Sequence, residues 1–467
     1  MLRTHTCGEL RAADAEKEAT LCGWVSAHRI QGKVSFILLR DRYGITQIFV
    51  DPKITKEIGE LRRETVVQVI GDVNKRPENQ VRTEMLTGEV ELSAKEVKVL
   101  SAAEPLPLEL DDSIESTDEI RLKYRYLDLR RPVMVENMQK RHQAVQFLRD
   151  HLDKKGFFEI TTPILTKSTP EGARDYLVPS RIHRGKFYAL PQAPQQYKQL
   201  LMVAGMDKYF QVAPCFRDEN ARANRAPGEF YQLDVEMSFV QQEDILNLIE
   251  ESIINMVKEI FPEKKFTKLP FPRLNYDEVM EKYGTDSPDI RENKEDNDEL
   301  GFCWVVNFPL LLKQSEEDFF HGAGKEWGPS HNMFTAPKET DIELLENDPG
   351  KAKSYQHDFV LNGNEVGGGA IRIHDAKLQE KIFELIGFDE KKKKEFSHLL
   401  EAFTYGVPPH GGIALGIDRL LMVIMGKESL RELIAFPKDK SARDPVMDAP
   451  AEVAQEQLDE LGISIKK

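Results

Sequence analysis

The stretch KYFQVAPCFRDEN (residues 208–220), followed after a short polar segment by FYQLDVEMSF (residues 230–239), decides how the larger part of this chain folds. Both stretches are rich in Val, Phe and Tyr, whose side chains favour the pleated, half-buried surface of a strand. The residues between them include Asn224, Pro227 and Gly228, which are typical of a loop. The pattern therefore predicts two neighbouring strands joined by a polar loop.

The flanking sequence extends this pair into a sheet with helices around it. Apolar runs predict further strands, and apolar residues at helical spacing predict helices. The expected strands are 157–160, 358–361, 367–373 and 413–417, and the expected helices are 133–155, 243–260, 377–386 and 419–425. Because strands and helices do not alternate strictly, we expect an α+β domain with a mixed, mostly antiparallel sheet flanked by helices.

The beginning of the chain has a different pattern. Short apolar stretches separated by turn signals predict five strands, at 20–27, 34–40, 45–51, 65–73 and 89–100. They suit a small closed barrel of the oligonucleotide-binding (OB) type, and a piece of a β-sandwich without a ligand is the alternative. Pro105 and Pro107, followed by acidic residues, predict a linker. The expected organisation is a barrel domain at 1–104, a hinge at 105–130 and a main domain at 131–467.

The composition restricts the class of protein. The chain has 467 residues, of which 40% are hydrophobic, and its formal net charge is −15. This charge argues against a general nucleic-acid coat but permits a local RNA site, because a groove needs positive charge only beside the phosphates. The four scattered cysteines predict neither a disulfide framework nor a zinc site, and they indicate a reducing, cytoplasmic environment. No leader is recognised, and Asp418 and Arg419 interrupt the most apolar long stretch, so no membrane segment is expected.

Three groups of residues suggest binding chemistry, and the first consists of Arg217, Glu219 and Phe230. The predicted strand pair could bring these residues around one ligand. Arginine offers a planar fork to a phosphate, a carboxylate can accept from an exocyclic amine, and an aromatic ring can stack on a base. From these residues alone, a surface Arg–Glu pair beside a core Phe is the preferred interpretation.

The second group is GGIALGIDR (residues 411–419), in which a glycine-rich apolar strand leads into a helix with Arg419 in its first turn. Glycines permit close approach of a ligand to the backbone, and a guanidinium near a helix N-terminus suits a triphosphate. The stretch lacks the Gly-Lys-Ser/Thr of a Walker loop, and its glycines could equally serve tight packing. The third group is Asp358 with Glu365, whose carboxylates would suit Mg²⁺ unless they are ordinary turn acids.

In this order, the three groups resemble the signature motifs of class II aminoacyl-tRNA synthetases. The first motif of that class, which forms its dimer interface, would be the predicted helix at 133–155 with the strand ending at Pro163. The stretches that narrow the resemblance to the bacterial-type aspartyl-tRNA synthetases are RYLDLRRP (125–132), TPEGARDY (169–176), ALPQ (189–192) and EVGGG (365–369). The resemblance covers nearly the whole chain, barrel included, and it implies a homodimer.

The resemblance implies ATP, L-aspartate and tRNA as substrates. Aspartate would attack the α-phosphorus of a bent ATP to give aspartyl-adenylate and pyrophosphate, and the acyl group would pass to the 3′-hydroxyl of the terminal ribose. The implied catalytic residues are Arg217 on the α-phosphate and Arg419 on the γ-phosphate, with Asp358 and Glu365 holding Mg²⁺. The implied ATP-binding positions are Arg217, Asp218, Glu219, Phe230, Glu365, Gly416, Ile417, Asp418 and Arg419.

Selection of aspartate would require buried cations that an asparagine amide leaves unpaired. The resemblance assigns that task to Lys198 and Arg372, with His331 closing the pocket. The full set of implied aspartate-binding positions is Glu171, Gln195, Lys198, Arg217, Asp234, His331 and Arg372. For each of them, an ordinary surface polar residue is the alternative.

In the resembling family the barrel binds the anticodon, whose unpaired bases can be stacked on aromatic rings and bonded at their edges. Phe36 matches the stacking position, and it would otherwise be a core strand residue. The positions that match base-edge contacts are Arg29, Gln47, Arg76 and Glu91.

The chain departs from the family pattern in several places. An insertion that bacterial members carry within the catalytic domain is missing near 290–301. Ala193 and Ala226 stand where polar residues are usual. Gln31 and Asn79 match neither pattern that separates members charging only aspartate tRNA from members that also charge asparagine tRNA, so both tRNAs are kept as candidates.

Three other functions compete with this one. An asparaginyl-tRNA synthetase is disfavoured by Lys198 with Arg372, because an amide does not call for two cations. A paralogue that adenylates an amino acid without charging tRNA is disfavoured by the intact barrel with Phe36. A non-catalytic tRNA-binding protein should have lost Arg217 or Arg419, and both are present.

Overall fold

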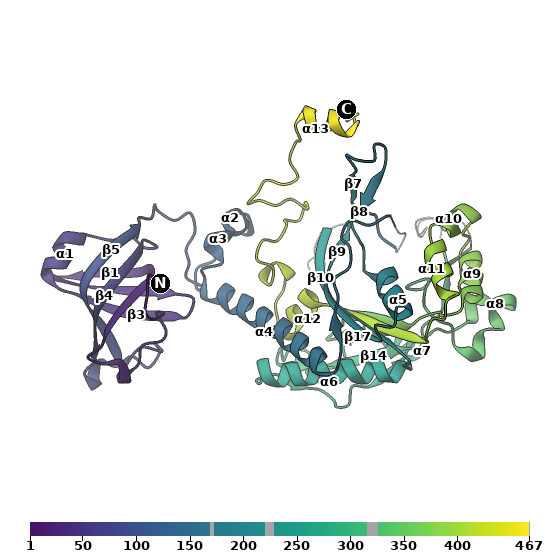
Figure 1. Ribbon diagram of the computed structural model, residues 1–467. Helices are drawn as coiled ribbons and strands as arrows, with labels where there is room; N and C mark the ends of the chain where they lie inside the picture. The colour runs from purple at the N-terminus through teal and green to yellow at the C-terminus, as the bar shows by residue number, and fades with distance from the viewer. Residues whose placement is uncertain (169–171, 220–227, 315–325, 467) are drawn as a thin grey trace. The chain divides into compact units, whose positions relative to one another are not determined.

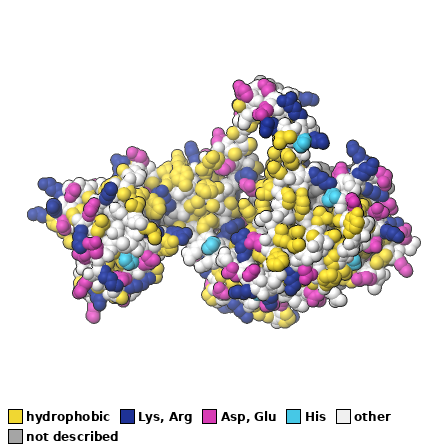
Figure 2. All heavy atoms as spheres, in the orientation of Figure 1, with side chains coloured by type: hydrophobic (Ala, Val, Ile, Leu, Met, Phe, Trp, Pro, Cys, Tyr) yellow, Lys and Arg dark blue, Asp and Glu magenta, His cyan; other side chains and the backbone are white. Residues whose placement is uncertain are grey.

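The computed structural model describes residues 1–168, 172–219, 228–314 and 326–466 (Figure 1). The chain divides into two compact units, Met1–Val135 and Glu136–Lys467. None of the helices in the described ranges combines the length and the hydropathy that crossing a bilayer requires. Positive and negative side chains are interspersed over the face shown in Figure 2, so the acidic excess does not gather in one visible patch there.

The first unit is built on a closed five-stranded barrel, which confirms the prediction and makes the sandwich alternative wrong. The strands are β1 (Glu18–Gln31), β2 (Val34–Asp41), β3 (Gly44–Val50), β4 (Val66–Lys75) and β5 (Val90–Ser101), in the order β1-β2-β3-β5-β4 around the barrel. Residues of β2 alternate strictly between buried and half-buried, because the side chains of a strand point alternately to its two faces. The inward side chains form a hydrophobic core that belongs to this unit, and they include Ile37, Leu39, Ile48, Val67 and Val69.

Two short helices, α2 (Asp118–Lys123) and α3 (Arg125–Asp128), lie within the range predicted as a hinge. Asp128 is fully buried and accepts hydrogen bonds from the side chains of Arg121, Arg125 and Arg131, at 3.0, 2.5 and 3.2 Å. Three guanidinium groups satisfy the lone pairs that burial would otherwise leave unpaired. The RYLDLRRP stretch therefore organises this segment instead of leaving it an irregular linker.

The second unit is organised by a sheet of eight strands in the order β12-β14-β17-β18-β19-β10-β9-β6 (Figure 1). Their bounds are β6 (Phe158–Glu159), β9 (Lys208–Arg217), β10 (Gly228–Ser238), β12 (Arg273–Asn275), β14 (Phe302–Val306), β17 (Gln356–Leu361), β18 (Asn364–Ile371) and β19 (His410–Gly416). β12 pairs with β14 and β6 with β9 in parallel, and the other neighbours are antiparallel. The predicted mixed, mostly antiparallel sheet is thus confirmed.

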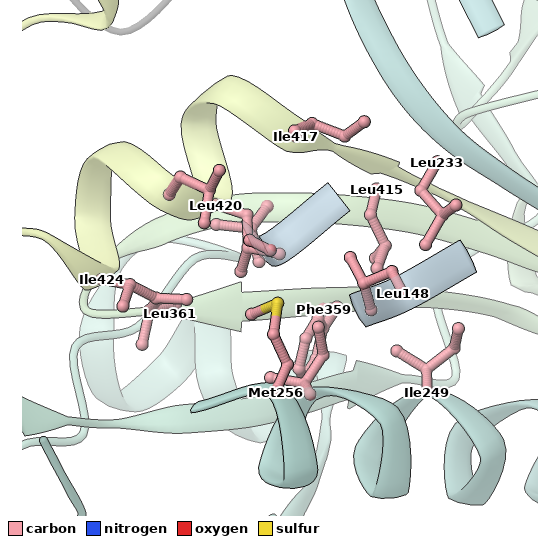
Figure 3. Close-up of a cluster of buried hydrophobic side chains, with 14 of the residues drawn as sticks. Leu148, Leu233, Ile249, Met256, Phe359, Leu361, Leu415, Ile417, Leu420 and Ile424 are labelled. Atoms are coloured by element: carbon pink, nitrogen blue, oxygen red, sulfur yellow. The ribbon is translucent and has the colours of Figure 1, made fainter. Parts of the chain in front are cut away.

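Helices α4 (Pro132–Lys154), α6 (Gln242–Ile260) and α12 (Ile417–Ile424) pack on one face of this sheet (Figure 3). The side chains packed there include Leu148, Ile249, Met256, Phe359, Leu361, Leu415 and Leu420. Leu233 and Val235 of β10 belong to the same core. Because side chains alternate along a strand, Asp234 and Glu236 point to the opposite face. The polar residues of the central strands are therefore gathered away from the helices.

A second hydrophobic cluster joins α9 (Ala376–Leu385) and α11 (Ser397–Phe403), and α5 (Gln195–Val203) packs against it through Leu200. Aromatic rings dominate this cluster. The contacting pairs among Phe334, Phe383, Phe388 and Phe396 have ring centroids 5.2–6.4 Å apart. The smaller elements are α1 (Pro52–Ile58), α7 (Tyr276–Tyr283), α8 (Leu344–Asn347), α10 (Glu390–Lys394), α13 (Gln455–Leu461), β7 (Leu177–Pro179), β8 (Phe187–Ala189), β11 (Lys265–Phe266), β13 (Glu299–Leu300), β15 (Leu311–Lys313) and β16 (Trp327–Pro329).

Candidate active site

A cavity of about 290 Å³ lies on the sheet face that carries Asp234. Residues of β9, β10, β18, β19, α5 and the first turn of α12 line it. The residues predicted from the sequence that line this cavity are Gln195, Lys198, Arg217, Glu219, Phe230, Asp234, His331, Glu365, Arg372, Gly416, Asp418 and Arg419. Positions that are far apart in the sequence therefore converge on one hollow.

The remaining predicted residues of this site are not among the lining residues. Asp358 is buried and hydrogen-bonds to two side chains that do line the cavity. Ile417 belongs to the hydrophobic core on the helix-covered face, and Asp218 is exposed at the end of β9. Glu171 and Ala226 lie outside the described residues.

The register of β9 and β10 brings the first predicted group together. Arg217 pairs with Gly228 across the two strands, and Cys215 pairs with Phe230. The guanidinium carbon of Arg217 is 5.1 Å from the centroid of the Phe230 ring, and its Nε donates to the carbonyl of Gln192 at 3.3 Å. A guanidinium beside an aromatic ring offers a fork for a phosphate and a flat surface for a base within one ligand's reach.

Glycines of β18 and β19 set how closely the strands approach. A Cβ on Gly369 would lie 2.1 Å from the carbonyl oxygen of Gly412, so a side chain there would separate the two strands. A Cβ on Gly368 would lie 3.2 Å from Asp358 Oδ1 and 3.5 Å from Glu365 Oε1. The two carboxylates therefore face the same glycine, and any side chain at Gly368 would fill the space beside them.

Four buried charged side chains form a network at this cavity. Lys198 Nζ lies 2.6 Å from Asp234 Oδ1 and 3.1 Å from Glu236 Oε2, and Arg372 Nε donates to Glu236 Oε1 at 3.0 Å. None of the four side chains is more than 4% exposed. Sequence reasoning missed Glu236, although its position two residues after Asp234 on one strand was a signal that the two share a face.

The network stabilises the ionised form of Glu236 more strongly than the ionised form of Asp234. Burial alone would raise the pKa of Glu236, but the charges of Arg372 and Lys198 outweigh it and bring that pKa to about 2. At Asp234 burial prevails, and the pKa is raised despite the neighbouring Lys198 ammonium. Glu236 is therefore the firmly ionised centre of the network, whereas Asp234 gains from any further positive charge that enters the cavity.

A second polar cluster surrounds Asp358. His331 Nε2 lies 3.0 Å from Asp358 Oδ2, and Gln356 Nε2 donates to Asp358 Oδ1 at 2.7 Å. Burial alone would lower the pKa of His331, but the Asp358 charge outweighs it and the pKa is raised. Burial raises the pKa of Glu365, and the negative charge of Asp358 raises it further. A carboxyl group such as Glu365, whose ionisation is disfavoured by burial and by a neighbouring negative charge, gains from a cation beside it.

The GGIALGIDR stretch forms strand β19 and the start of α12, as predicted. Arg419, in the first turn of α12, donates from Nη1 to the carbonyl oxygen of Glu365 at 2.8 Å. Asp418 is buried and accepts a hydrogen bond from Arg141 Nε at 2.8 Å. Burial raises the pKa of Asp418, although Arg141 acts in the opposite direction. The turn from β19 to α12 therefore places the Arg419 guanidinium at the cavity. The turn is itself held in position by the hydrogen bond from Arg141 to Asp418.

A chain of buried hydrogen bonds fixes Gln195. Gln195 Nε2 donates to Gln199 Oε1 at 3.1 Å, and Gln199 Nε2 lies 3.2 Å from His410 Nε2. His410 Nδ1 lies 2.8 Å from the carbonyl of Pro408, so this nitrogen carries the proton and Nε2 accepts from Gln199. The chain leaves Gln195 Oε1 as an acceptor at the cavity. The helical spacing of Gln195 and Gln199 is the one feature of the sequence that indicates this hydrogen-bond chain.

In the first unit, a cavity of about 420 Å³ lies on the barrel. Arg29, Phe36, Gln47 and Arg76 line it, and Glu91 accepts a hydrogen bond from Gln47 Nε2 at 3.0 Å. All five residues that the resemblance assigned to the anticodon are thus at this cavity or bonded to its lining.

Arg76 is the most unusual residue of the barrel cavity. It is 7% exposed, and its Nε and Nη2 have no hydrogen-bond partner among the described residues. Burial lowers its pKa. Gln31 and Asn79 line the same cavity. The lining therefore combines the Arg76 guanidinium, with these two unpaired donor nitrogens among the described residues, and amides that can donate or accept.

Comparisons with known proteins agree with this arrangement. A family model described as class II tRNA synthetases (D, K and N) matches residues 117–440. A second model, described as an OB-fold nucleic acid binding domain, matches residues 19–100, which contain the barrel strands.

Curated relatives match over the full length. The aspartate–tRNA(Asp/Asn) ligase of Thermoanaerobacter pseudethanolicus is 40% identical over 593 aligned residues, which cover 99% of this chain and 98% of that protein. The aspartate–tRNA ligase of Clostridium tetani is 40% identical over 595, covering 100% and 98%. Since 593 aligned positions exceed the 467 residues of this chain, at least 126 of them have no counterpart in it.

Solved structures share the fold. Asparaginyl-tRNA synthetase from Pyrococcus horikoshii, complexed with asparaginyl-adenylate, superposes with a TM-score of 0.75 at 23% identity, covering 94% of this chain and 98% of that one. Aspartyl-tRNA synthetase from Entamoeba histolytica gives 0.72 at 23% identity, covering 94% and 92%. Both amino-acid specificities therefore occur on this fold. The family model that spans most of the chain, together with the full-length curated relatives, shows that the chain belongs to the class II tRNA synthetases, in the family of bacterial aspartate–tRNA ligases.

Proposed function

We propose that this chain activates L-aspartate with ATP and transfers it to the 3′ end of tRNA. An oxygen of the α-carboxylate attacks the α-phosphorus of ATP, the bond to the β-phosphate oxygen breaks, and pyrophosphate leaves. The 3′-hydroxyl of the terminal ribose then attacks the aspartyl carbonyl, and AMP leaves. The observation that carries this proposal is one cavity lined by Lys198 and Arg372 as well as by Arg217 and Arg419.

The phosphate side of the reaction is assigned to two guanidinium groups. Arg217 binds the α-phosphate and offsets the charge that develops there, and Arg419 binds the γ-phosphate. Phe230 stacks on adenine, and Glu219 accepts from its exocyclic amine. These assignments are supported by the Arg217–Phe230 contact at 5.1 Å and by the fixed position of Arg419 on the carbonyl of Glu365.

Aspartate selectivity is assigned to the buried network. Lys198 and Arg372 carry two positive charges, and Asp234 and Glu236 carry two negative charges, so the ionised network is neutral. Aspartate brings one side-chain carboxylate and one ammonium and preserves the balance, whereas asparagine brings the ammonium alone. Leaving a buried charge unpaired costs about 3–5 kcal/mol, which is the discrimination we expect. Gln195 Oε1 and Asp234 accept from the ammonium.

Magnesium binding is assigned to Asp358 and Glu365. Mg²⁺ prefers hard oxygen ligands and keeps several waters, so it needs few protein groups. The described residues contain no cluster of three or more His, Cys, Asp or Glu side chains suited to a metal, which fits an ion held largely by water and ATP oxygens. The raised pKa of Glu365, caused by burial and by Asp358, fits a site that gains from a cation. The ion would neutralise phosphate charge.

The barrel cavity is assigned to the anticodon. Phe36 offers a stacking surface, and Arg76 has two donor nitrogens without a partner among the described residues. The aspartate tRNA is the primary substrate. Gln31 and Asn79 line the same cavity, and their amides can donate or accept, so the asparagine tRNA is kept as a second candidate substrate.

The proposed oligomeric state is a homodimer, and the proposed location is the cytoplasm. A homodimer through α4 and β6 is supported by the edge position of β6 and by the exposed apolar side chains of Phe158, Ile164 and Leu165. A reducing, cytoplasmic location is supported by four free cysteines, three of them buried. The positions missing relative to the curated relatives are assigned to the segment near 290–301, so any tRNA contacts of that insertion are lost while the cavity is kept.

Aminoacylation with purified aspartate and asparagine tRNAs, each tested with both amino acids, examines the proposal. We expect aspartate to be attached to the aspartate tRNA and, more slowly, to the asparagine tRNA. Attachment of asparagine to either tRNA would contradict the assignment of Lys198 and Arg372. Adenylate formation without attachment to either tRNA would instead favour the paralogue that has lost tRNA charging.

A further inference from the structure

Asp418 lines the active-site cavity, and none of the roles assigned above uses its buried carboxylate. Three elements of the second unit meet at this group. Asp418 belongs to the first turn of α12, and it accepts a hydrogen bond from Arg141 Nε of α4 at 2.8 Å. It also accepts a hydrogen bond from the backbone N–H of Tyr231 in β10. The carboxylate therefore joins α4, β10 and α12 at the edge of the cavity.

The hydrogen bond from Tyr231 continues the sheet past the end of β19. Gln232 of β10 is paired with Gly416, the last residue of β19, so Tyr231 lies just beyond the paired stretch. A backbone N–H in such a position needs another acceptor, and a side chain can supply it. Asp418 does so where the chain turns from β19 into α12. This junction of Tyr231 with Asp418 ties the start of α12 to the strand that carries Phe230.

The residues next to this junction are two of those assigned to ATP. Phe230, which precedes Tyr231 on β10, is assigned to adenine. Arg419, which follows Asp418 on α12, is assigned to the γ-phosphate. A bent nucleotide meets both groups at once, so its binding depends on the separation between the start of α12 and this end of β10. The carboxylate of Asp418 sets that separation, because it is part of α12 and is bonded to β10.

Arg141 is the cation that stabilises Asp418 in this position. Burial raises the pKa of Asp418, and the charge of Arg141 acts in the opposite direction. The guanidinium carbon of Arg141 also lies 6.0 Å from the centroid of the Tyr231 ring, so Arg141 contacts both members of the junction. Its helix is held against α12 by Leu148 and Leu420, which pack in one core (Figure 3). Arg141 is not among the described residues that line the cavity, so it reaches ATP only through its neighbours.

We propose that Arg141 is a positioning residue for ATP, and that it acts through the Asp418 carboxylate to keep the two ATP-binding groups beside the junction at the separation that a bent nucleotide requires. This inference rests on the proposed function, which supplies the roles of Phe230 and Arg419. A binding group that is displaced by about 1 Å loses much of its effect, so a support that never touches the ligand controls its affinity.

The aspartate side of the cavity is supported separately. Lys198 and Arg372 form buried ion pairs with Glu236, which lies further along β10 than Tyr231. A local change at Arg141 should therefore weaken ATP binding and leave aspartate binding in place. A general loss of stability would instead lower the active fraction of the protein and change neither affinity.

Calorimetry of ATP binding to the full-length protein in the presence of Mg²⁺ tests this role. Arg141→Met should raise the Kd for ATP about tenfold, the loss expected for one charge-assisted hydrogen bond, while the KM for aspartate in pyrophosphate exchange stays within about twofold of the wild type. Arg141→Lys should recover part of the affinity, since it keeps the charge and loses the planar fork. Lys155→Gln removes an exposed ion pair with Glu251 just past the end of α4, so it is the control and should match the wild type.

A double-mutant cycle tests the route through Asp418. Asp418→Asn keeps an acceptor for the Tyr231 N–H and removes the charge that Arg141 neutralises. If Arg141 acts through Asp418, Arg141→Met should weaken ATP binding much less in the Asp418→Asn background than in the wild type. Fully additive losses would contradict this route. Arg141→Gln, a polar replacement for a partly exposed side chain, gives the same comparison if Arg141→Met does not fold.

Three further results would overturn the proposal. An unchanged Kd for ATP in a folded Arg141→Met protein would remove Arg141 from the support of the site. Equal increases in the KM for ATP and for aspartate would indicate a general distortion of the cavity. A change of oligomeric state in sedimentation that accompanies the loss of ATP affinity would assign the effect to assembly through α4. Absence of pyrophosphate exchange in the wild type would remove the proposed function, and the Kd values for ATP would still decide the role of Arg141.

Discussion

Replacing Glu236 by Gln removes the carboxylate that joins Lys198 to Arg372. Glu236 is fully buried and lies 3.1 and 3.0 Å from these two cations. Its pKa of about 2 is below the ordinary value of 4.5, and that difference corresponds to about 3 kcal/mol of stability when the carboxylate is ionised. Breaking a buried charge network costs a similar ~3–5 kcal/mol. We therefore expect E236Q to lower the free energy of unfolding of the second unit by about 3 kcal/mol at neutral pH.

The stability difference between the wild type and E236Q should depend on pH, in a direction set by the depressed pKa of Glu236. Because the folded-state pKa of Glu236 is depressed, its contribution is complete above about pH 4.5 and is lost as the pH falls toward 2. The variant lacks this titration. The difference in unfolding free energy between wild type and E236Q should therefore shrink by about 1 kcal/mol between pH 6 and pH 3.5.

The assay is urea unfolding followed by tryptophan fluorescence in a Trp24→Phe background, in which Trp304 and Trp327 report on the second unit. The control is E251Q, since Glu251 forms an exposed ion pair with Lys155 at 2.6 Å and should contribute about 0–1 kcal/mol. A cost of less than about 1 kcal/mol for E236Q would refute the reasoning. A difference that stays constant between pH 6 and pH 3.5 would refute it as well.

Three further predictions concern binding. Arg372→Leu should reduce aspartate-dependent pyrophosphate exchange by about a hundredfold or more while ATP binding is kept, and unchanged exchange would remove Arg372 from the aspartate pocket. Phe36→Ala should weaken tRNA binding about tenfold, within the ~1–3 kcal/mol that a stacked base contributes, without changing adenylate formation; loss of both together would count against a dedicated anticodon role. Glu365→Gln should raise the Mg²⁺ concentration needed for half-maximal exchange about tenfold, as expected when one ligand of a metal is weakened, and an unchanged Mg²⁺ dependence would remove Glu365 from the ion's site.

Local patterns predicted the elements of the fold well. The alternation in FYQLDVEMSF and the apolar run before Arg217 identified β10 and β9 to within two residues, because a strand's side-chain period is visible in one short stretch. The five barrel strands were found for the same reason. The helix α5 was missed, since its residues are nine in number and carry no N-cap side chain that would mark the start. The two helices within 105–130 were hidden by the prolines and acidic residues before them.

Long-range partners could not be predicted from local patterns. The resemblance supplied Lys198 and Arg372, but the contact of both with Glu236 depends on the strand order of the sheet, which no single stretch encodes. The same holds for Gln199 and His410, which are separated by 211 positions and meet because β19 returns beside β10. Sequence reasoning therefore named the groups that would touch a substrate and missed the groups that hold them in place.

The most direct measurement is the ratio of kcat/KM for aspartate and asparagine in ATP–pyrophosphate exchange, which needs no tRNA. If Lys198 and Arg372 hold the side-chain carboxylate in the neutral network, aspartate should be preferred by at least about a hundredfold, as expected for a buried charge left unpaired by the amide. Equal rates, or a preference for asparagine, would contradict the claim that this cavity is built for an acidic amino acid.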